Sequence, residues 1–254
     1  MVKAEVDLMD ERKVALVTGG TRGIGRAITD ALAESGVHVA ASYRSNAESA
    51  RETCEEAASK GWSVSAHQMN VGSPEECNGY VSEVLESYGR VDYLINNAGI
   101  NIDRTVRRMT VDDWQRVMDI NMSGAFYMVK AVIEHMVARG SGRIVNISSI
   151  IGETGNVGQA NYATAKSGLF GLTKSLALEL AGKGITVNSI APGFITTDML
   201  ASVPENVLQQ IVARIPVGRL GQASEVAFAV ANLLDDRAAY ITGAVIPVNG
   251  GLDM

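Results

Sequence analysis

A serine, a tyrosine and a lysine near the middle of the chain, Ser149, Tyr162 and Lys166, form a set that can handle protons. Tyr162 and Lys166 are four residues apart, so on a helix they lie on one face. A neighbouring ammonium favours the phenolate, so we expect it to lower the pKa of the tyrosine from its usual value near ~10. Tyr162 would then exchange a proton near neutral pH, while the Ser149 hydroxyl holds a substrate oxygen. The Tyr-x-x-x-Lys spacing alone is weak evidence, because such pairs arise by chance on exposed helices.

A glycine-rich turn lies near the N-terminus, in the segment Thr18-Gly19-Gly20-Thr21-Arg22-Gly23-Ile24-Gly25. Glycines at such a turn let the backbone approach a pyrophosphate, and the N-terminus of the following helix favours its negative charge. The spacing is G-x-x-x-G-x-G rather than G-x-G-x-x-G, and a tight strand–helix connection is the alternative. Its place at the first strand–helix turn favours a dinucleotide site. The expected contacts are Gly19, Thr21, Arg22, Gly23, Ile24 and Gly25.

The end of the second predicted strand indicates which dinucleotide binds. A carboxylate there would bind the 2′-hydroxyl of NAD, but the chain reads Ser42-Tyr43-Arg44-Ser45. Arg44 suits the 2′-phosphate of NADP because guanidinium and phosphate pair well, and Arg22 can reach the same phosphate. A solvated loop arginine is the alternative, and we favour NADPH or NADP as the cofactor.

Two further strand ends complete the expected cofactor site. Asn70 and Val71 end the third strand, where the amide can meet the adenine edge. The small residues of Asn96-Asn97-Ala98-Gly99 end the fourth strand and can pack close to the adenosine ribose. The two asparagines are also expected to satisfy backbone groups of the turn.

Composition limits the classes of function. The 254 residues carry a net charge of −6, which disfavours sequence-independent nucleic-acid binding. No apolar run reaches the roughly 18 residues of a membrane helix, and residues 1–10 lack a signal-peptide core. Cys54 and Cys77 have no metal-ligand spacing and the three histidines are scattered, so we expect free thiols in a reducing cytoplasm and no metal site.

Strand-like and helix-like segments alternate along the whole chain. This alternation predicts an α/β fold with a parallel sheet and helices on both faces. We expect a lead-in at 1–10 and a single domain at 11–254, with a lid-like segment at about 193–220. Predicted strands cover 13–18, 37–43, 63–69, 92–96, 143–147, 185–190 and 244–248. Predicted helices cover 25–35, 47–60, a segment capped by Ser73, a stretch from Thr110 to Arg139, 162–181 and 224–234.

Taken together, these motifs resemble the short-chain dehydrogenase/reductase family, in family order and with the family's spacing. The resemblance rests on the glycine turn, Asn96 to Gly99, Asn121, Ser149, Tyr162-x-x-x-Lys166 and Pro192-Gly193. It implies a single-domain Rossmann-type doubly wound fold with a seven-stranded parallel sheet, an NAD(P) cofactor and the catalytic tetrad Asn121, Ser149, Tyr162 and Lys166. The ten-residue lead-in departs from the family pattern, and so does Asn70, where many members carry Asp.

Within that family, several stretches resemble the 3-oxoacyl-[acyl-carrier-protein] reductases and acetoacetyl-CoA reductases. They include Gly158 to Tyr162, Ala191 to Met199, Ile215 to Gly221 and Val248 to Gly251. The resemblance implies NADPH, a cytoplasmic homotetramer that pairs through the helix after Tyr162 and through the C-terminal strand, and an acyl thioester or acyl carrier protein as partner.

The implied reaction reduces a 3-oxoacyl thioester to the 3-hydroxyacyl thioester. Ser149 and Tyr162 would hold the C3 carbonyl oxygen, and Tyr162 would donate the proton. Lys166 would bind the nicotinamide ribose, and Asn121 would support a proton-supplying water. The nicotinamide end would meet Pro192, Gly193, Ile195 and Thr197.

The acyl chain is expected beside Asn156, Val157 and Gln159, which lie between Ser149 and Tyr162. Met199 and Leu200 open the suspected lid. Surface cations are candidates for docking the carrier, although each is more simply a solvated charge. They are Arg104, Arg107, Arg108, Arg139, Arg143 and Lys183.

Two alternatives stay open. The first is another dehydrogenase of the same fold that acts on a sugar, steroid or quinone. The second is an NADP-binding regulator without catalysis, which a complete tetrad disfavours because such a protein does not need all four groups.

Overall fold

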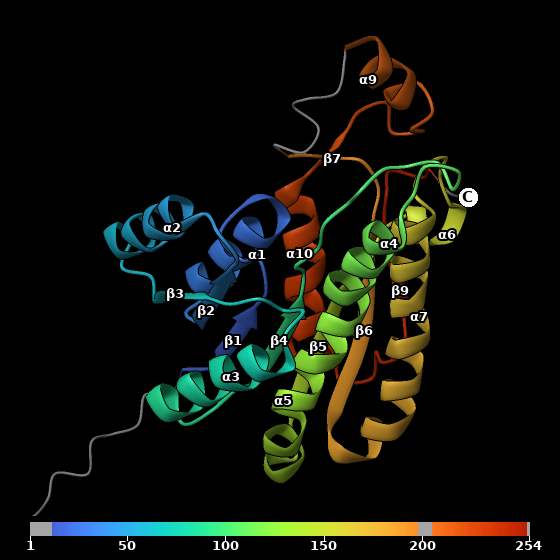
Figure 1. Ribbon diagram of the computed structural model, residues 1–254. Coiled ribbons are helices and arrows are strands. Elements are labelled where there is room, and N and C mark those ends of the chain that lie inside the picture. Colours follow the sequence, from blue (N-terminus) through green and yellow to red (C-terminus); the bar gives the residue numbers. More distant parts are fainter. Residues whose placement is uncertain (1–11, 198–204, 253–254) are drawn as a thin grey trace, which may run out of the picture.

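A seven-stranded parallel sheet forms the centre of the protein, in the order β3-β2-β1-β4-β5-β6-β9 (Figure 1). The computed structural model describes residues 12–197 and 205–252, so the lead-in and the lid residues Met199 and Leu200 lie outside the described part. All seven predicted strands are confirmed. They are β1 (Val14–Val17), β2 (His38–Tyr43), β3 (Val64–Gln68), β4 (Tyr93–Asn96), β5 (Gly142–Ile147), β6 (Ile185–Pro192) and β9 (Val245–Val248).

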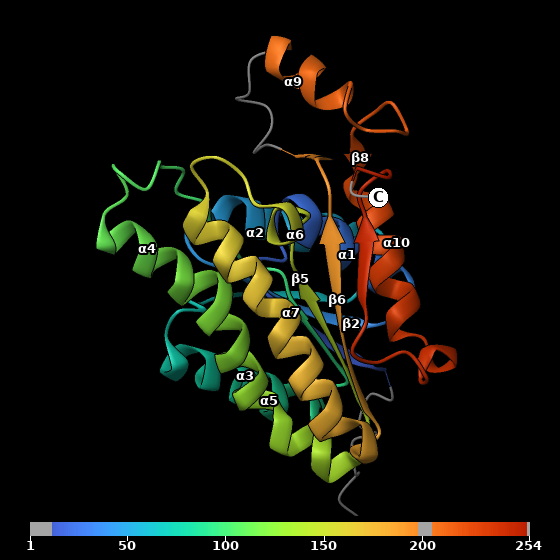
Figure 2. The same cartoon turned by 90° about the vertical axis from the view of Figure 1, so that its right-hand side faces the viewer.

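Helices cover both faces of this sheet (Figure 2). The helices α1 (Gly23–Glu34) and α10 (Ala223–Leu234) pack over one face, while α3 (Pro74–Tyr88), α5 (Gly124–Arg139) and α7 (Ala160–Leu180) pack over the other. Every residue of β1, β4, β5 and β6 is buried, which explains why these strands read as apolar runs rather than alternating patterns. The result is the predicted doubly wound α/β fold.

Strand order reverses at one point, and this reversal places the site. From β1 the chain moves outward to β2 and β3, then returns to β4 on the opposite side of β1 and continues to β5. Ligands of such sheets bind outside the carboxyl ends of the strands at the reversal. The turns after β1, β4 and β5 therefore border the expected ligand site.

The predicted helical stretch from Thr110 to Arg139 is divided into three parts. A capping box of Thr110 and Asp113 starts α4 (Val111–Met118), and a π-helical turn, η1 (Asp119–Ser123), connects it to α5. A π turn accommodates an extra residue in the helix and is frequent at functional sites. Asn121 lies on this turn.

The segment before α10 is irregular, as the sequence predicts. The short β7 (Ile195–Thr196) pairs with β8 (Gly221–Gln222), and α9 (Glu205–Val212) stands above the carboxyl ends of the strands (Figure 1). The remaining helices are α2 (Ala47–Ser59) and the short α6 (Ile151–Thr154), η2 (Ala181–Lys183) and η3 (Asp236–Ala238). None of the helices in the described ranges is long and apolar enough to cross a membrane.

Candidate active site

The four residues of the expected tetrad meet at the carboxyl ends of β4 and β5. Asn121 comes from the π turn, Ser149 follows β5, and Tyr162 and Lys166 lie one turn apart on α7. A Cβ built on Gly99, directly after β4, would be 3.4 Å from Asn121 Oδ1 and 3.5 Å from Lys166 Nζ. The fold therefore brings together side chains from three separate segments. From the sequence, their proximity is only an expectation.

Lys166 is a buried ammonium with one direct protein acceptor among the described residues. Its Nζ donates to the Ile147 carbonyl oxygen at 2.7 Å, and its own carbonyl accepts from Ser148 Oγ at 2.7 Å. Burial lowers the pKa of Lys166 to about 8, because the interior disfavours its charge. The lysine is thus fixed at the end of β5 and can release a proton close to neutral pH.

The expected lowering of the tyrosine pKa is wrong for this structure. Burial raises the pKa of Tyr162, a hydrogen bond with the Ser149 hydroxyl opposes this, and the charge of Asp103 adds to it. The Lys166 ammonium contacts the Ile147 carbonyl and lies 5.7 Å from the centre of the Tyr162 ring, so it does not offset the desolvation. Tyr162 is therefore held in its protonated form, as a proton donor requires.

The side-chain amide of Asn121 hydrogen-bonds the loop after β4 and not its own helix. Its Oδ1 accepts from the Ile100 N–H at 2.8 Å, and its Nδ2 donates to the Ile100 carbonyl oxygen at 2.8 Å. The paired bonds fix the loop after β4 against the π turn.

A cavity of about 10 Å³ lies beneath these groups, large enough for about one water molecule. Lys166, Asn121 and Thr18 contribute to its wall, together with Asn96, whose Oδ1 has no hydrogen-bond partner within the described part of the chain. A cavity of this size beside a buried amine and the Asn96 amide oxygen is suited to hold a proton-carrying water.

The glycine turn is built to bring backbone close to backbone. A Cβ on Gly25 would lie 2.1 Å from the Gly19 carbonyl oxygen, and Gly23 has a positive φ of 53°. Asn97 Nδ2 donates to the Thr18 and Gly19 carbonyl oxygens at 2.9 and 3.1 Å, so the expected backbone role of this asparagine is confirmed. The turn is consequently narrow, rigid and open to a phosphate at the N-terminus of α1.

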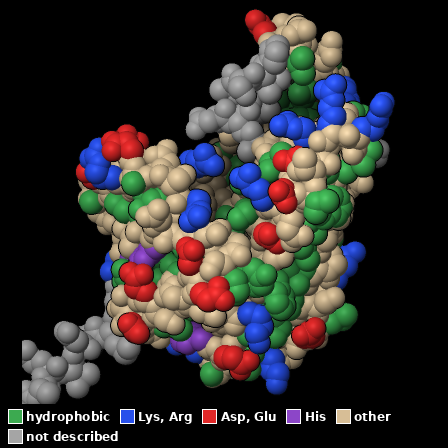
Figure 3. Space-filling view, viewed as in Figure 1, with side chains coloured by type: hydrophobic (Ala, Val, Ile, Leu, Met, Phe, Trp, Pro, Cys, Tyr) green, Lys and Arg blue, Asp and Glu red, His purple; other side chains and the backbone are tan. Residues whose placement is uncertain are grey.

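The two arginines expected at the 2′-phosphate are both exposed. Arg22 is the N-cap of α1 and Arg44 follows β2. Neither makes an ion pair with any residue that the structure describes, so both guanidinium groups are available to an anion. Figure 3 shows Lys and Arg side chains at the border of a recess on this face.

The nicotinamide end is close to the same turn. Thr197 Cγ2 would be 3.6 Å from a Cβ on Gly23, which places the two expected contacts side by side. The Gly193 N–H donates to the Val248 carbonyl oxygen at 2.9 Å, and the Ile150 N–H donates to that of Pro192 at 2.9 Å. Ile195, two residues further on, is buried. These residues fit a dinucleotide that extends from the glycine turn towards Tyr162.

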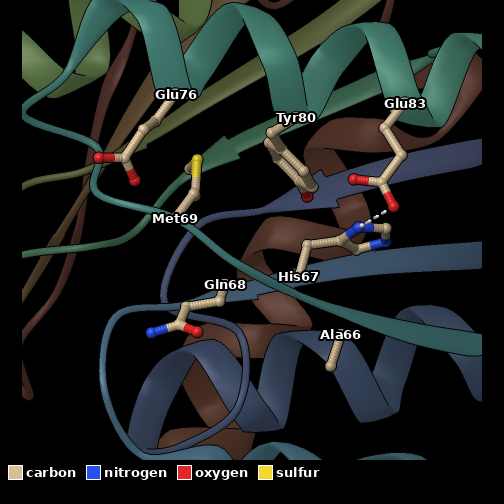
Figure 4. Close-up of a pocket in the computed structure, with 7 residues that line it drawn as sticks. All are labelled: Ala66, His67, Gln68, Met69, Glu76, Tyr80 and Glu83. Carbon is tan, nitrogen blue, oxygen red and sulfur yellow. Dashed lines mark ion pairs between the residues drawn. The ribbon is translucent and has the colours of Figure 1, made fainter.

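The predicted adenine loop is held by a residue that the sequence reasoning did not assign. Glu76 Oε2, on α3, accepts from the Asn70 N–H at 2.7 Å, and Asn70 Oδ1 accepts from the Gly72 N–H at 3.1 Å. Glu76 also borders a larger hollow of about 340 Å³ between β3 and α3, where His67 pairs with Glu83 (Figure 4). None of the tetrad lines this hollow, so we place the chemistry at the smaller cavity.

The residues expected on the acyl side form a short chain of amides. Asn156 Nδ2 donates to Gln159 Oε1 at 2.9 Å, and Gln159 Nε2 donates to Asp103 Oδ1 at 3.0 Å. Val157 between them is 88% exposed, which gives an apolar contact at the rim. Asp103 was missed because nothing in its local sequence distinguishes it from a solvated loop carboxylate.

Some candidate docking cations are far from the site. Arg143 is buried near the start of β5, at the opposite end of the strands, and pairs with Asp236 at 3.6 Å, so its prediction as a docking residue is wrong. Arg139 pairs with Asp92 at 3.7 Å. The loop arginines Arg104, Arg107 and Arg108 are exposed, and the Arg104 N–H donates to the Gly158 carbonyl oxygen, four residues before Tyr162. The described residues contain no group of three or more His, Cys, Asp or Glu that could hold a metal ion.

Comparison with known proteins agrees with this geometry. A family profile described as "Enoyl-(Acyl carrier protein) reductase" matches residues 19–253. The chain belongs to the short-chain dehydrogenase/reductase family. It is therefore an oxidoreductase, and its family depends on nicotinamide dinucleotides.

Several curated relatives cover nearly the whole chain. The 3-oxoacyl-[acyl-carrier-protein] reductase FabG of Staphylococcus aureus (strain Mu50 / ATCC 700699) is 45% identical over 97% of this chain and 100% of its own. The protein of the same name from Aquifex aeolicus (strain VF5) is 48% identical over 94% and 97%. The acetoacetyl-CoA reductase of Shinella zoogloeoides is 47% identical over 94% and 98%.

Proposed function

We propose that this enzyme reduces a 3-oxoacyl thioester to the 3-hydroxyacyl thioester with NADPH, as a step of fatty acid biosynthesis or related lipid metabolism. The observation that carries the proposal is Tyr162 hydrogen-bonded to Ser149, with Lys166 buried one turn along α7 and held at the end of β5. The names of the relatives support the thioester substrate, because both kinds act on 3-oxoacyl groups.

The choice of NADPH is supported by charge. Arg22 and Arg44 are exposed and no carboxylate follows β2 at Ser42 to Ser45, so the 2′-phosphate finds cations and no repulsion. When bound, the nicotinamide supplies a hydride to the C3 carbonyl carbon. We assign its binding to the glycine turn, to Lys166 at the ribose and to Thr197 at the carboxamide.

The chain's own groups handle the carbonyl oxygen and its proton. Ser149 Oγ accepts from the Ile151 N–H at 3.1 Å, and its hydroxyl also hydrogen-bonds Tyr162. In place of the Tyr162 oxygen, a bound substrate oxygen would accept from the Ser149 hydroxyl. Tyr162 donates a second hydrogen bond to that oxygen and transfers its proton as negative charge develops there. Tyr162 is suited to the reduction direction, because burial keeps its phenol protonated until negative charge develops on the substrate oxygen.

Tyr162 must then recover a proton from the protein side. Lys166, with its pKa lowered to about 8, and the cavity beside Asn121 provide a path for this transfer. The unpaired Asn96 Oδ1 offers the water an acceptor in the same cavity. Asn121 holds the wall of the cavity through its two bonds to Ile100.

The test is the oxidation of NADPH with acetoacetyl-CoA and with longer 3-oxoacyl carriers. We expect turnover with NADPH well above that with NADH. Tyr162→Phe should bind NADPH with unchanged affinity and lose turnover by a factor of roughly 10² or more, the usual contribution of a general acid. Turnover of a sugar, steroid or quinone in place of the thioesters would contradict the proposal, and so would an active Tyr162→Phe variant.

We further propose a single catalytic domain over residues 11–254 and a cytoplasmic homotetramer. Large apolar side chains are exposed on α5, α7 and α10 and near the C-terminal strand, including Phe126, Leu178, Phe228 and Tyr240. Such exposure suits burial between subunits. Light scattering coupled to size exclusion gives the mass, and a monomer at micromolar concentration would contradict the tetramer.

A further inference from the structure

Three hydrogen bonds fasten the loop that follows β4 to the start of α7. They join Asn161 Nδ2 to the Ile102 carbonyl (3.1 Å), Gln159 Nε2 to Asp103 Oδ1 (3.0 Å) and the Arg104 N–H to the Gly158 carbonyl (2.8 Å). Tyr162 is the next residue on α7, and its N–H donates to Asn161 Oδ1 at 2.8 Å. The position of the proton donor therefore depends on this attachment.

Asp103 is the only carboxylate among these contacts, and it organises the amides on the acyl side. Gln159 donates to Asp103 and in turn accepts from Asn156 at 2.9 Å, so one carboxylate determines which way both amides point. With its oxygen and nitrogen both engaged, Gln159 has a fixed orientation. Loss of the Asp103 acceptor would release Gln159 first and Asn156 with it.

The charge of Asp103 also acts on the phenol. It raises the pKa of Tyr162, in the same direction as burial and against the Ser149 hydrogen bond. Several other charged residues lie on the elements packed around Tyr162, but Asp103 alone among them contributes to this change. They are Lys166 on α7, Arg104 in the loop, Asp112, Asp113 and Arg116 on α4, Asp119 on η1 and Glu153 on α6.

We propose that Asp103 is a positioning residue of the reduction. Its carboxylate, hydrogen-bonded to Gln159, holds Gln159 and Asn156 for the acyl chain. From this fixed place beside the start of α7, its negative charge adds to the burial that disfavours the Tyr162 phenolate. The inference rests on the proposed function for its kinetic part and on the hydrogen-bonded loop for its structural part.

Two substitutions separate the two effects. Asp103→Asn removes the charge but retains a carbonyl acceptor for Gln159, whereas Asp103→Ala removes both. In the pH profile of kcat/KM for acetoacetyl-CoA, Asp103→Asn should move the alkaline limb to lower pH by roughly half a unit, as expected for one exposed charge nearby. Asp103→Ala should show the same movement and raise KM by roughly three- to tenfold, the effect of one hydrogen bond.

Asp112→Asn is the matched control, because it removes an exposed carboxylate from the first turn of α4, which packs against α7. It should leave the profile where the unmodified enzyme has it. A profile for Asp103→Asn that coincides with that of the unmodified enzyme or with that of Asp112→Asn would overturn the electrostatic role. An unchanged KM in Asp103→Ala would overturn the role in holding the amides.

A second measurement does not depend on turnover. Alkaline titration of tyrosinate absorbance, with the Tyr162→Phe signal subtracted to isolate one of the seven tyrosines, should show a lower midpoint in Asp103→Asn than in the unmodified protein. If acetoacetyl-CoA and the longer carriers are not reduced at all, the proposed function fails, while this titration still judges Asp103. Equal midpoints would overturn the inference whatever the substrate.

Discussion

Replacing Lys166 by methionine should stabilise the folded protein at neutral pH while it abolishes catalysis. The ammonium is buried, and burial lowers its pKa from 10.5 to about 8. The unfolded chain holds this proton more tightly than the folded chain does. The buried charge therefore lowers the free energy of unfolding, and this loss of stability is fully present below pH 8. The cost disappears as the pH rises from about 8 to 10.5. Methionine has a similar length and no charge to desolvate.

The size of the effect follows from the change in pKa. At about 1.4 kcal/mol per pKa unit, the charged lysine costs about 3 kcal/mol at pH 7. Methionine cannot donate to the Ile147 carbonyl oxygen, which lysine reaches at 2.7 Å, and this loss costs about 1 kcal/mol. We therefore expect Lys166→Met to be more stable by about 2 kcal/mol at pH 7 and less stable by about 1 kcal/mol at pH 10.5.

Urea unfolding of both proteins at several pH values, at one fixed protein concentration, measures this difference. Lys174→Met, which replaces an exposed lysine on the same helix, controls for helix propensity and for general effects of pH. The reversal of sign is the decisive feature, because a simple packing change does not titrate. If the stability difference between Lys166→Met and the unmodified protein were the same at both pH values, the buried ammonium would not carry the cost.

Three further substitutions test the remainder of the site. Arg44→Glu should raise KM for NADPH by roughly 10- to 100-fold and leave KM for NADH nearly unchanged, because it removes a charged phosphate partner; equal losses with both cofactors would contradict the 2′-phosphate assignment. Gly25→Ala should weaken NADPH binding in a fluorescence titration and lower the free energy of unfolding by about 1–3 kcal/mol, because the added Cβ would lie 2.1 Å from the Gly19 carbonyl oxygen. The control is Gly79→Ala, where nothing lies within 4 Å of the added Cβ. Asn121→Ala should leave both Ile100 groups unpaired and cost about 2 kcal/mol in urea unfolding as well as turnover, so full activity in this variant would refute the assigned role.

The parallel sheet with helices on both faces could be anticipated from local pattern, whereas the electrostatics of the site could not. Buried parallel strands read as apolar runs, and the glycine turn marks the first strand–helix connection, so the alternation of strands and helices follows from the sequence. The direction of the Tyr162 pKa does not follow. It depends on how deeply the phenol is buried and on which acceptor Lys166 reaches, and both are determined by the packing of α7 against β5.

The same limit applies to residues whose role comes from a distant partner. Asn121 looked like part of one long helix, but the π turn directs its amide to Ile100 across the site. Asp103 and Glu76 carry no local signal that names their partners, yet each fixes a segment that the sequence had marked for binding. Tertiary structure determines which partner a carboxylate has. From sequence alone, an acidic residue in a loop or on a helix surface is compatible both with a solvated side chain and with one that bonds a distant segment.

These observations give the direction of the reaction a physical basis. The proton donor Tyr162 needs a high pKa, because it must keep its proton until negative charge develops on the substrate. Lys166, which restores that proton, needs a lower pKa. Burial provides both at once, because it disfavours the charged form of each group: the phenolate of Tyr162 and the ammonium of Lys166. The ordinary pKa values of the two groups lie close together, and burial moves them apart, upward for Tyr162 and down to about 8 for Lys166. Proton transfer from the Lys166 ammonium to a tyrosinate is therefore downhill, which matches the two groups to their roles as relay and acid. A site with exposed Tyr and Lys side chains would have the same sequence motif without this match, so the motif specifies the chemistry only where the fold buries it.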